Sequence, residues 1–301
     1  MDQQTTELVT ISTTGTQANS WSVPAGVSDD GRYVFFHSHA TNLVPGGTTP
    51  QARHIYVRDR LLQTTEIVLE IPPTSYGPFW SFTAGPDGRF ITYDFQLPGP
   101  DGVSRLTSVI REMQTGATET LSVATDGTPA NHATYAVAVG PAGAFVLLRA
   151  TASNLVSGDT NGRQDVFVRD RRQGSTTLVS VAHDGSPADA ESSAGPGSIS
   201  ANGRYVTFTS SATNLVPSDT NGHQDVFVRD RRHSGATRRV SVASDGAQAD
   251  GHSFAAFISA RGRFVAFASI ATNLVEDDSN GHRDVFVHDL RHGTTRRVSV
   301  G

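Results

Sequence analysis

The chain has 301 residues and a formal net charge of −5, and it contains neither Lys nor Cys. A mildly acidic chain without a basic block lacks the electrostatic footprint of a nucleic-acid-binding protein, and the absence of Cys excludes disulfides, thiol catalysis and cysteine-based zinc sites. No stretch approaches the ~18 consecutive apolar residues that a membrane-spanning helix requires. These features predict a chain that binds no nucleic acid and does not insert into a membrane.

In chain order, the first predicted element is an N-terminal closing strand over about residues 5–12, followed by five repeats. The repeats share a motif of Gly, usually Arg, an aromatic residue and Val or Ile, which recurs about every 55–60 residues. The motifs begin at Gly31, Gly88, Gly143, Gly203 and Gly262. A period of this length indicates a unit that stacks on copies of itself to bury its apolar surface. We therefore expect one domain over residues 1–301, with repeats at about 20–70, 77–123, 131–181, 190–242 and 251–300.

Each repeat predicts four short strands, A to D, and no part of the chain shows helical periodicity. Strand A is a weak stretch such as 254–259, strand B alternates as in 263–268, strand C is an apolar run such as 225–228, and strand D covers a segment such as 237–242. Asp-Gly and Asn-Gly pairs predict tight A–B turns. The longer B–C loop carries a Thr-Asn-Leu-Val element, whose leucine we expect to plug the loop against the sheet. These leucines are Leu43, Leu155, Leu215 and Leu274.

Four antiparallel strands per repeat, without helices, predict an all-β fold, a β-propeller of four-stranded blades. The strand-B motif followed by Asp-Val-Phe-Val-Arg-Asp, as at 225–230, resembles the TolB-type, WD40-like propeller repeats. The resemblance covers about residues 5–300 and implies a fold rather than a function. Because A–B–C blocks occur five times and D-like segments six times, we favour five blades, with the D segments of both termini competing for, or sharing, the edge of the closing blade. A six-bladed ring is the alternative.

The B–C loops of the last three repeats carry Asp-Thr/Ser-Asn-Gly-x-x-Asp. Oxygen ligands at this spacing resemble those that surround Ca²⁺, but the same residues also form Asx turns and Asn-Gly turns. Calcium is therefore a candidate cofactor, and turn formation is the competing interpretation. The candidate metal ligands are Asp159, Asn161, Asp165, Asp219, Asn221, Asp225, Asp278, Asn280 and Asp284.

The D–A loops differ most between repeats, and in a propeller they lie with the B–C loops on one face around the central channel. Aromatic, His and carboxylate side chains that converge on such a rim can form a binding site. The candidate ligand-binding residues are Trp21, Trp80, His132, Tyr135, Asp189, Glu191, Asp250 and His252. We expect His37 and His39 to serve ordinary packing. No catalytic motif is present, so no catalytic residue is assigned.

The first functional hypothesis is a non-catalytic, monomeric propeller that presents this face to a glycan, peptide or protein ligand. One alternative is an enzyme that uses the same funnel, such as a hydrolase, lyase or cyclase. The other is a structural module of a larger envelope protein. We expect a secreted or cell-envelope location. A cytoplasmic one stays open, because the N-terminal Met-Asp-Gln-Gln carries neither a basic nor an apolar leader.

Overall fold

The structure, a computed structural model, describes residues 6–49, 52–71, 82–98, 101–232 and 235–299. It contains five antiparallel sheets of four strands each, here called blades 1 to 5. Blade 1 consists of β1 (Ser22–Val27), β2 (Tyr33–Ser38), β3 (Arg53–Asp59) and β4 (Thr64–Ile71). Blade 2 consists of β5 (Phe82–Ala84), β6 (Phe90–Pro98), β7 (Ser104–Glu112) and β8 (Thr118–Thr120). Blade 3 consists of β9 (Thr134–Val139), β10 (Phe145–Ala150), β11 (Asp165–Asp170) and β12 (Ser175–Leu178), with the 3-10 turn η1 (Pro141–Gly143) between its first two strands. Blade 4 consists of β13 (Ser192–Ser193), β14 (Tyr205–Ser210), β15 (Asp225–Asp230) and β16 (Ala236–Arg239). Blade 5 consists of β17 (Ser253–Ile258), β18 (Phe264–Ser269), β19 (Asp284–Asp289) and β20 (Thr294–Arg297).

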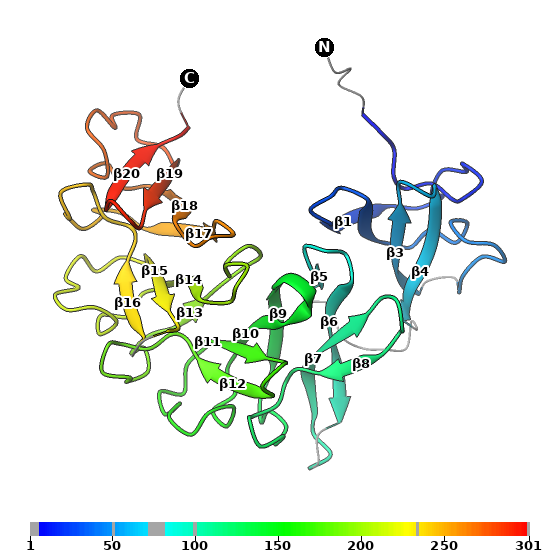
Figure 1. The fold of residues 1–301 in the computed structure, drawn as a ribbon, viewed down its shortest axis with the longest axis horizontal. Coiled ribbons are helices and arrows are strands. Elements are labelled where there is room, and N and C mark those ends of the chain that lie inside the picture. The colour runs from blue at the N-terminus through cyan, green and yellow to red at the C-terminus, as the bar shows by residue number, and fades with distance from the viewer. Residues whose placement is uncertain (1–5, 50–51, 72–81, 99–100, 233–234, 300–301) are drawn as a thin grey trace.

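The blades are arranged radially, with the first strand of each blade toward the centre and the fourth toward the outside (Figure 1). In every blade the strands pair in sequence order, as a meander. This arrangement confirms the predicted all-β propeller with five four-stranded blades.

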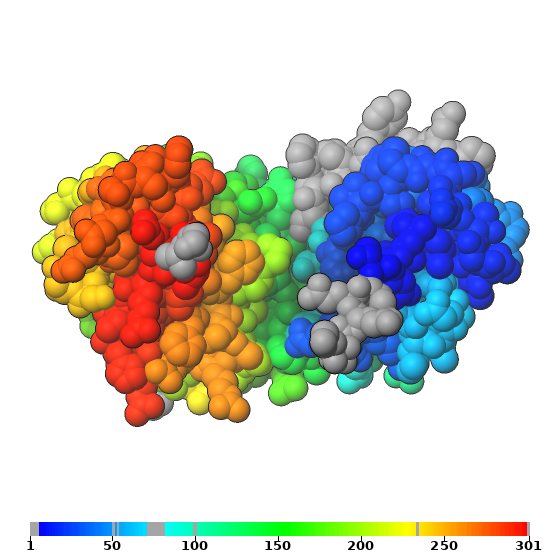
Figure 2. Space-filling view, turned by 90° about the horizontal axis from the view of Figure 1, so that it is seen from above, coloured from blue at the N-terminus to red at the C-terminus, as the bar shows by residue number. Residues whose placement is uncertain are grey.

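The arc of blades is open between blade 5 and blade 1, and the first and last described residues of the chain lie on its two sides (Figure 1). Seen from above, green atoms from the middle of the chain are visible between the orange and red blade 5 and the blue blade 1 (Figure 2). Within the described ranges, no strand of blade 5 pairs with a strand of blade 1.

The N-terminal segment does not act as the closing strand that the sequence predicts. Within residues 6–12, only Ile11 forms a β-bridge, and its partner is the nearby Gln17. The Glu7 carboxylate instead pairs with Arg60 of blade 1 at 2.8 Å. Blade 5 takes its fourth strand, β20, from the C-terminal side. The two D segments therefore do not compete, because the N-terminal one lies against blade 1.

Within a blade, the alternation of strand B and strand C buries one aromatic residue from each. Phe208 of β14 stands opposite Phe227 of β15, and their ring centroids are 5.6 Å apart. Phe267 and Phe286 repeat this stack in blade 5 at 5.7 Å. The predicted plug residues are confirmed as buried. They are Leu43, Leu155, Leu215 and Leu274.

The remaining apolar side chains of strands B, C and D form the cores between blades. One such core joins Val226, Val228 and Val240 of blade 4 to Ile258 and Val265 of blade 5. A sheet has two faces, and a blade buries both of them only when it packs between two neighbouring blades. In the described part of the chain, blades 1 and 5 each have only one neighbouring blade, so one face of each packs against no other blade (Figure 1).

The aspartate of the Arg-Asp pair at the end of strand C fixes the C–D turn. The Asp59 carboxylate accepts hydrogen bonds from the backbone N–H groups of Leu61 and Leu62. This aspartate also has a second role, which the sequence did not predict. The same carboxylate binds Arg32, the arginine of the Gly-Arg-aromatic motif, at 2.7 Å. Arg204–Asp230 and Arg263–Asp289 repeat this bond, and each guanidinium lowers the pKa of its aspartate.

Candidate functional site

Trp21 is the most prominent side chain on the predicted rim. It directly precedes β1 and is 54% exposed. Its ring contacts His37, in T-shaped geometry at 5.8 Å between centroids, and His39 at 4.6 Å. The two histidines come from the end of β2 and the loop that follows it, so they support the indole rather than merely filling space. This cluster of Trp21, His37 and His39 is called the tryptophan platform below.

A second aromatic group lies at the corresponding place on blades 4 and 5. His252 directly precedes β17, is exposed, and lies 4.8 Å from His223 in T-shaped geometry. Its Nδ1 accepts a hydrogen bond from the Gln224 backbone N–H at 2.9 Å. The Arg283 guanidinium lies 4.6 Å from the centre of the Phe254 ring, next to His252. The histidine ring is thus held in place, with cationic and aromatic neighbours.

Two predicted carboxylates on the rim have structural partners. Asp189 accepts hydrogen bonds from the Thr213 backbone N–H at 2.8 Å and from the Thr213 hydroxyl at 2.7 Å. Asp250 binds both groups of Thr272 in the same way, each at 2.7 Å. Asn19 and Asn131 make equivalent contacts in blades 1 and 3. We conclude that Asp189 and Asp250 tie the D–A loop to the Thr-Asn-Leu-Val element.

The other predicted rim residues have unequal surroundings. His132 and Glu191 are exposed, whereas Tyr135 is half-buried beneath the Arg149 guanidinium, 4.9 Å from its ring centre. Trp80 lies outside the described residues.

In blades 4 and 5, the predicted metal-binding aspartates have an arginine between them. Arg239 of β16 lies 2.8 Å from Asp219 and 3.5 Å from Asp225, with all three side chains buried. Arg297 of β20 pairs in the same manner with Asp278 and Asp284, at 2.8 and 3.7 Å. A guanidinium therefore supplies the positive charge that a metal ion would otherwise bring.

In blade 3 the corresponding residue is Leu178, so this aspartate pair has no such cation. Asp159 is 5% exposed, and its Oδ1 accepts no hydrogen bond. Asp165 is fully buried and is bound by the Ser180 hydroxyl at 2.5 Å and by the Asn161 amide at 2.6 Å. Burial raises the pKa of Asp165 to about 6 and also raises the pKa of Asp159.

The three predicted asparagine ligands act as turn residues. The Asn161 amide donates to Asp165, and its carbonyl accepts from the Arg163 backbone N–H at 2.8 Å. Asn221 and Asn280 form the same pair of bonds in blades 4 and 5. Within the described part of the chain, no three His, Cys, Asp or Glu side chains gather to hold a metal ion.

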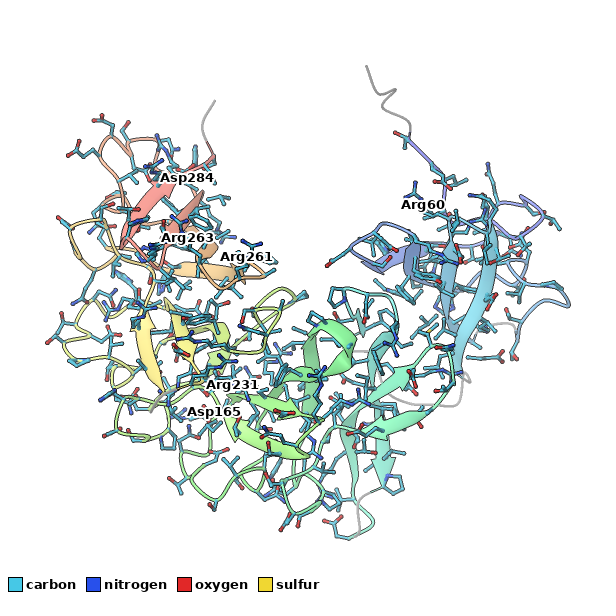
Figure 3. The ribbon with its side chains drawn as sticks, viewed as in Figure 1. Arg60, Asp165, Arg231, Arg261, Arg263 and Asp284 are labelled. Atoms are coloured by element: carbon cyan, nitrogen blue, oxygen red, sulfur yellow. The ribbon has the colours of Figure 1, made fainter. Side chains whose placement is uncertain are left out.

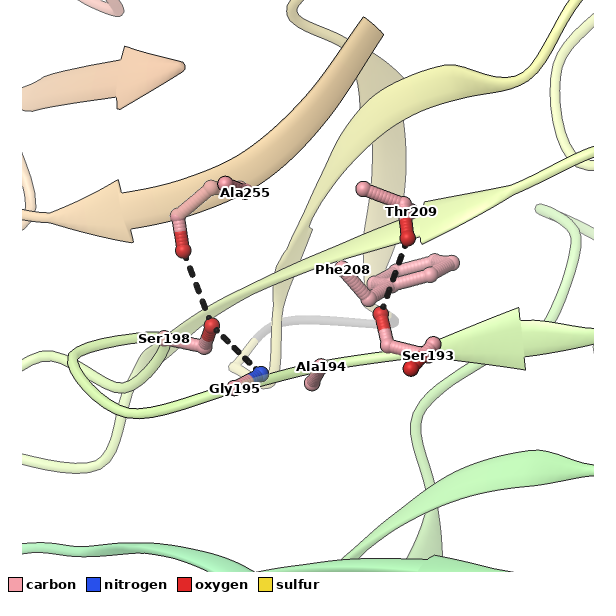
Figure 4. Close-up of a pocket in the computed structure, with 8 residues that line it drawn as sticks. Ser193, Ala194, Gly195, Ser198, Phe208, Thr209 and Ala255 are labelled. Atoms are coloured by element: carbon pink, nitrogen blue, oxygen red, sulfur yellow. Dashed lines mark hydrogen bonds between the residues drawn. The ribbon is translucent and has the colours of Figure 1, made fainter. Parts of the chain in front are cut away.

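A small pocket lies between blades 4 and 5 (Figure 4). It has a volume of about 200 Å³ and is lined mostly by small residues. It forms because β13 is only two residues long and is followed by Ala194, Gly195 and Pro196 rather than by a regular strand. The Ser198 hydroxyl, which donates to Ala256 at 2.9 Å, closes one side. Its small size and small residues suit close packing of the two blades more than recognition of a ligand.

No family model and no curated protein matches the chain, but solved structures do. A protein assigned as TolB from Agrobacterium tumefaciens aligns with a TM-score of 0.50 and 16% identity, over 93% of this chain and 81% of that one. An acylaminoacyl peptidase aligns with a TM-score of 0.54 and 11% identity, over 94% of this chain and 39% of its own. A prolyl endopeptidase gives 0.53 and 10%, over 93% and 36%. The chain thus spans less than two-fifths of either peptidase.

At these identities, the similarity establishes the fold alone. By fold, the chain is a TolB-like β-propeller. In the described part of this TolB-like propeller, no helix is long and apolar enough to cross a membrane.

Some residues of the candidate site were not predicted from the sequence. Comparing strand D across the repeats, Thr-Arg-Arg against Thr-Thr-Leu, would have revealed Arg239 and Arg297 as partners of the acidic loops. The contacts of His37 and His39 cannot be predicted by comparing the repeats, because they depend on the position of the Trp21 ring in space.

Proposed function

We propose that this TolB-like propeller is a non-catalytic binding protein that holds a peptide segment of a protein partner on the D–A/B–C face. The observation that carries the proposal is the tryptophan platform. A large aromatic ring exposed over half its surface and braced by two other rings is typical of binding hot spots. Since its supports come from β2 and the adjoining loop, the ring needs little ordering when a partner binds.

The group around His252 supports the same proposal. His252, Phe254 and Arg283 offer an aromatic edge, a cation and a hydrogen-bonding ring on blade 5. Together with Trp21 on blade 1, they give two anchor points on the same face, separated by the opening. An extended peptide can reach both, and acidic or aromatic side chains would suit them.

An enzyme is the weaker proposal. General acid–base catalysis requires a carboxylate or histidine that is free to exchange a proton with the substrate. Both oxygens of Asp189 and of Asp250 are engaged by threonines, and His252 already accepts a backbone hydrogen bond. Glu191 is the remaining predicted carboxylate, and among the described residues no second acid or base pairs with it.

Selection of peptides from a phage-displayed random library on the full chain tests the proposal. We expect Trp21→Ala to weaken the selected peptides at least 10-fold, as loss of an aromatic hot spot does. Leu61→Ala is the matched control, because Leu61 is also a large apolar residue and is even more exposed than Trp21, but it lies in the β3–β4 turn on the opposite face. Selected peptides that bind Trp21→Ala as well as wild type would contradict the proposal, and so would retention of glycans but no peptides on arrays.

We also propose that the B–C loop of blade 3 binds Ca²⁺ through Asp159 and Asp165. Two buried carboxylates without a cation are unfavourable, and the unpartnered Oδ1 of Asp159 is available to a metal ion. Carboxylate oxygens are the ligands that Ca²⁺ prefers, and water and backbone carbonyls can complete its shell. We restrict the proposal to this one loop because arginines already pair with the corresponding aspartates of blades 4 and 5.

Thermal unfolding with Ca²⁺ and with chelator tests this second proposal. A ligand that binds only the folded state raises Tm, so we expect Ca²⁺ to raise it for the wild type. Leu178→Arg should raise Tm in chelator and abolish the response to Ca²⁺, because it copies the arginine of blade 4. A Tm that ignores millimolar Ca²⁺, or a response that survives Leu178→Arg, would refute the blade 3 site.

The secreted or cell-envelope location likewise stays a proposal. Fractionation of the native host, with antibody detection, would test it.

A further inference from the structure

One contact joins every pair of neighbouring blades. The aromatic residue of the Gly-Arg-aromatic motif in one blade lies on the motif glycine of the next, so closely that a methyl group on that glycine would overlap the ring. The four pairs are Tyr33 on Gly88, Phe90 on Gly143, Phe145 on Gly203, and Tyr205 on Gly262. An arginine of the receiving blade covers the ring at two of these interfaces: Arg171 over Phe90 at 5.0 Å and Arg231 over Phe145 at 5.3 Å.

On blade 5 the same aromatic residue, Phe264, lies on no glycine of the part of the chain that the structure describes. Phe264 is 41% exposed and stacks only on Arg263 of its own blade. The neighbouring Val285 is 43% exposed, whereas its counterpart Val226 in blade 4 is fully buried. Val298 is likewise exposed where Val240 is buried. This face of blade 5 therefore carries an inter-blade surface that faces solvent.

On blade 1 the receiving half of the contact is exposed. The nearest group to a methyl placed on Gly31 is Arg60 of the same blade, not a ring from a neighbour. Val27 is 58% exposed, whereas its counterparts Val139 and Ile258 are buried against the preceding blade. Figure 3 shows Arg60 on blade 1 and Arg261 on blade 5, on opposite sides of the opening.

The N-terminal segment lies where the fourth strand of a preceding blade would lie. Glu119 of β8, the fourth strand of blade 2, pairs with Arg171 of blade 3 at 2.8 Å. Glu7 pairs with Arg60 of blade 1 at the same distance. Arg171 and Arg60 also both donate to the carbonyl of their own motif glycine, at 2.9 and 2.8 Å.

The turn after this segment continues the likeness. Thr176 of blade 3 donates to the Val123 carbonyl, in the turn that leaves blade 2, at 2.7 Å. Thr65 of blade 1 donates to the Ile11 carbonyl at 2.5 Å. Residues 6–9 thus follow the course of a fourth strand, although no strand pairs with them within the described ranges.

We propose that the opening is a docking site for a protein partner that contributes a three-stranded antiparallel sheet of this same repeat type. Its third strand would pair with residues 6–9, as in β-augmentation. Its turn glycine would receive Phe264, and its own aromatic residue would lie on Gly31 beneath Arg60. We infer these contacts from the four interfaces between neighbouring blades. At each of them, the motif aromatic residue of one blade lies on the motif glycine of the next. This site is separate from the tryptophan platform.

The experiment inserts a copy of residues 190–235, which carry strands A to C of blade 4, directly before Thr5 of the full chain. Residues 5–9 then continue the inserted segment as its fourth strand. We expect Tm to rise by about 5 °C or more, and amide exchange of residues 6–9 to slow at least about 100-fold. The parent chain is the control for both measurements.

Two substitutions separate docking from mere stability. Phe264 and Val27 lie on opposite faces of the opening. Phe264→Asp and Val27→Asp should each lower the Tm of the extended chain by several degrees. Each should change the Tm of the parent chain by less than about 2 °C. Unchanged exchange of residues 6–9 after the insertion would overturn the proposal, and so would equal losses of Tm in parent and extended chain. A parent dimer in analytical ultracentrifugation that Phe264→Asp dissociates would overturn it in favour of a second copy. The Trp21 test of the rim is independent of all these outcomes.

Discussion

The inner interfaces and the two faces of the opening use the same residues in opposite surroundings. Tyr205 lies on Gly262 between blades 4 and 5, whereas Phe264, its counterpart one repeat later, is exposed. Val226 is buried where Val285 is exposed. This difference shows that the apolar residues that recur at the same position in each repeat pack between blades rather than within one blade. Their burial depends on a neighbour, as expected for a repeat protein.

The largest effect should come from adding a methyl group to the motif glycine. Gly203 has a φ of +68° and receives the Phe145 ring, so Gly203→Ala combines backbone strain with overpacking. We expect it to reduce the free energy of unfolding by about 3 kcal/mol. Gly31→Ala has a similar φ of +67° but meets only Arg60, so a loss of about 1 kcal/mol is expected. Urea titration measures both values, and equal losses would show that the aromatic contact contributes nothing.

A smaller difference should separate the valines of strand C. Val226→Ala removes buried methyl groups from an inter-blade core and should cost about 2 kcal/mol. Val285→Ala removes partly exposed ones from the face of the opening and should cost about 0.5 kcal/mol or less. The same titration gives both numbers. If Val285→Ala is as destabilising as Val226→Ala, the face of blade 5 at the opening is buried in solution, and the difference between inner interfaces and opening does not hold.

The smallest effect concerns the residue before the acidic residue, Asp or Glu, at the end of strand C. Blades 1 to 4 have Arg58, Arg111, Arg169 and Arg229 there, and blade 5 has His288. His288 is buried and its Nδ1 lies 2.9 Å from the Thr295 hydroxyl. Burial lowers the pKa of His288, so the imidazole stays neutral in the folded protein while the unfolded chain takes up a proton near pH 6.5.

The unfolded state then binds more protons as the pH falls, and stability decreases with it. The contribution of His288 is fully present above about pH 6.5 and is lost below that value. We expect Tm to fall between pH 7 and pH 5, and His288→Arg, which copies the other blades, to flatten this part of the profile. An identical pH profile in the variant would assign the acid sensitivity to other groups.

The sequence predicted most of the fold because the repeat states the strand pattern five times over. Strand alternation and Asn-Gly or Asp-Gly turns gave the four-stranded blades, and the burial of Leu43 and its counterparts followed from their place in the loop. What failed was the N-terminal closing strand. The segment matches a fourth strand in residue type, and Glu7 binds Arg60 of blade 1 as Glu119 of β8 binds Arg171 of blade 3. Within the described ranges, however, no third strand pairs with the segment.

The candidate site was harder to predict, because its properties arise from contacts between distant residues. The sequence predicts that Asp189 and Asp250 are available to bind a ligand, but in the structure their carboxylates accept hydrogen bonds from Thr213 and Thr272. The three acidic loops are nearly identical in sequence, yet Leu178 in one strand D and arginine in the other two give them different charge. The sequence of an acidic loop by itself does not show whether a positively charged residue of strand D lies next to it.

The central claim is that blades 5 and 1 remain apart while inner neighbours are in contact. Because the chain has no Cys, spin labels can be attached at introduced cysteines only, at equivalent exposed positions in the A–B turns. The pair Ala201→Cys and Ala260→Cys spans blades 4 and 5, where the backbone N–H of Ala201 donates to the Ala260 carbonyl at 3.0 Å. The pair Ala260→Cys and Asp29→Cys spans the opening. Double electron–electron resonance should give a clearly longer distance for the second pair. Equal distances would mean that the five blades close on themselves and that no docking site exists.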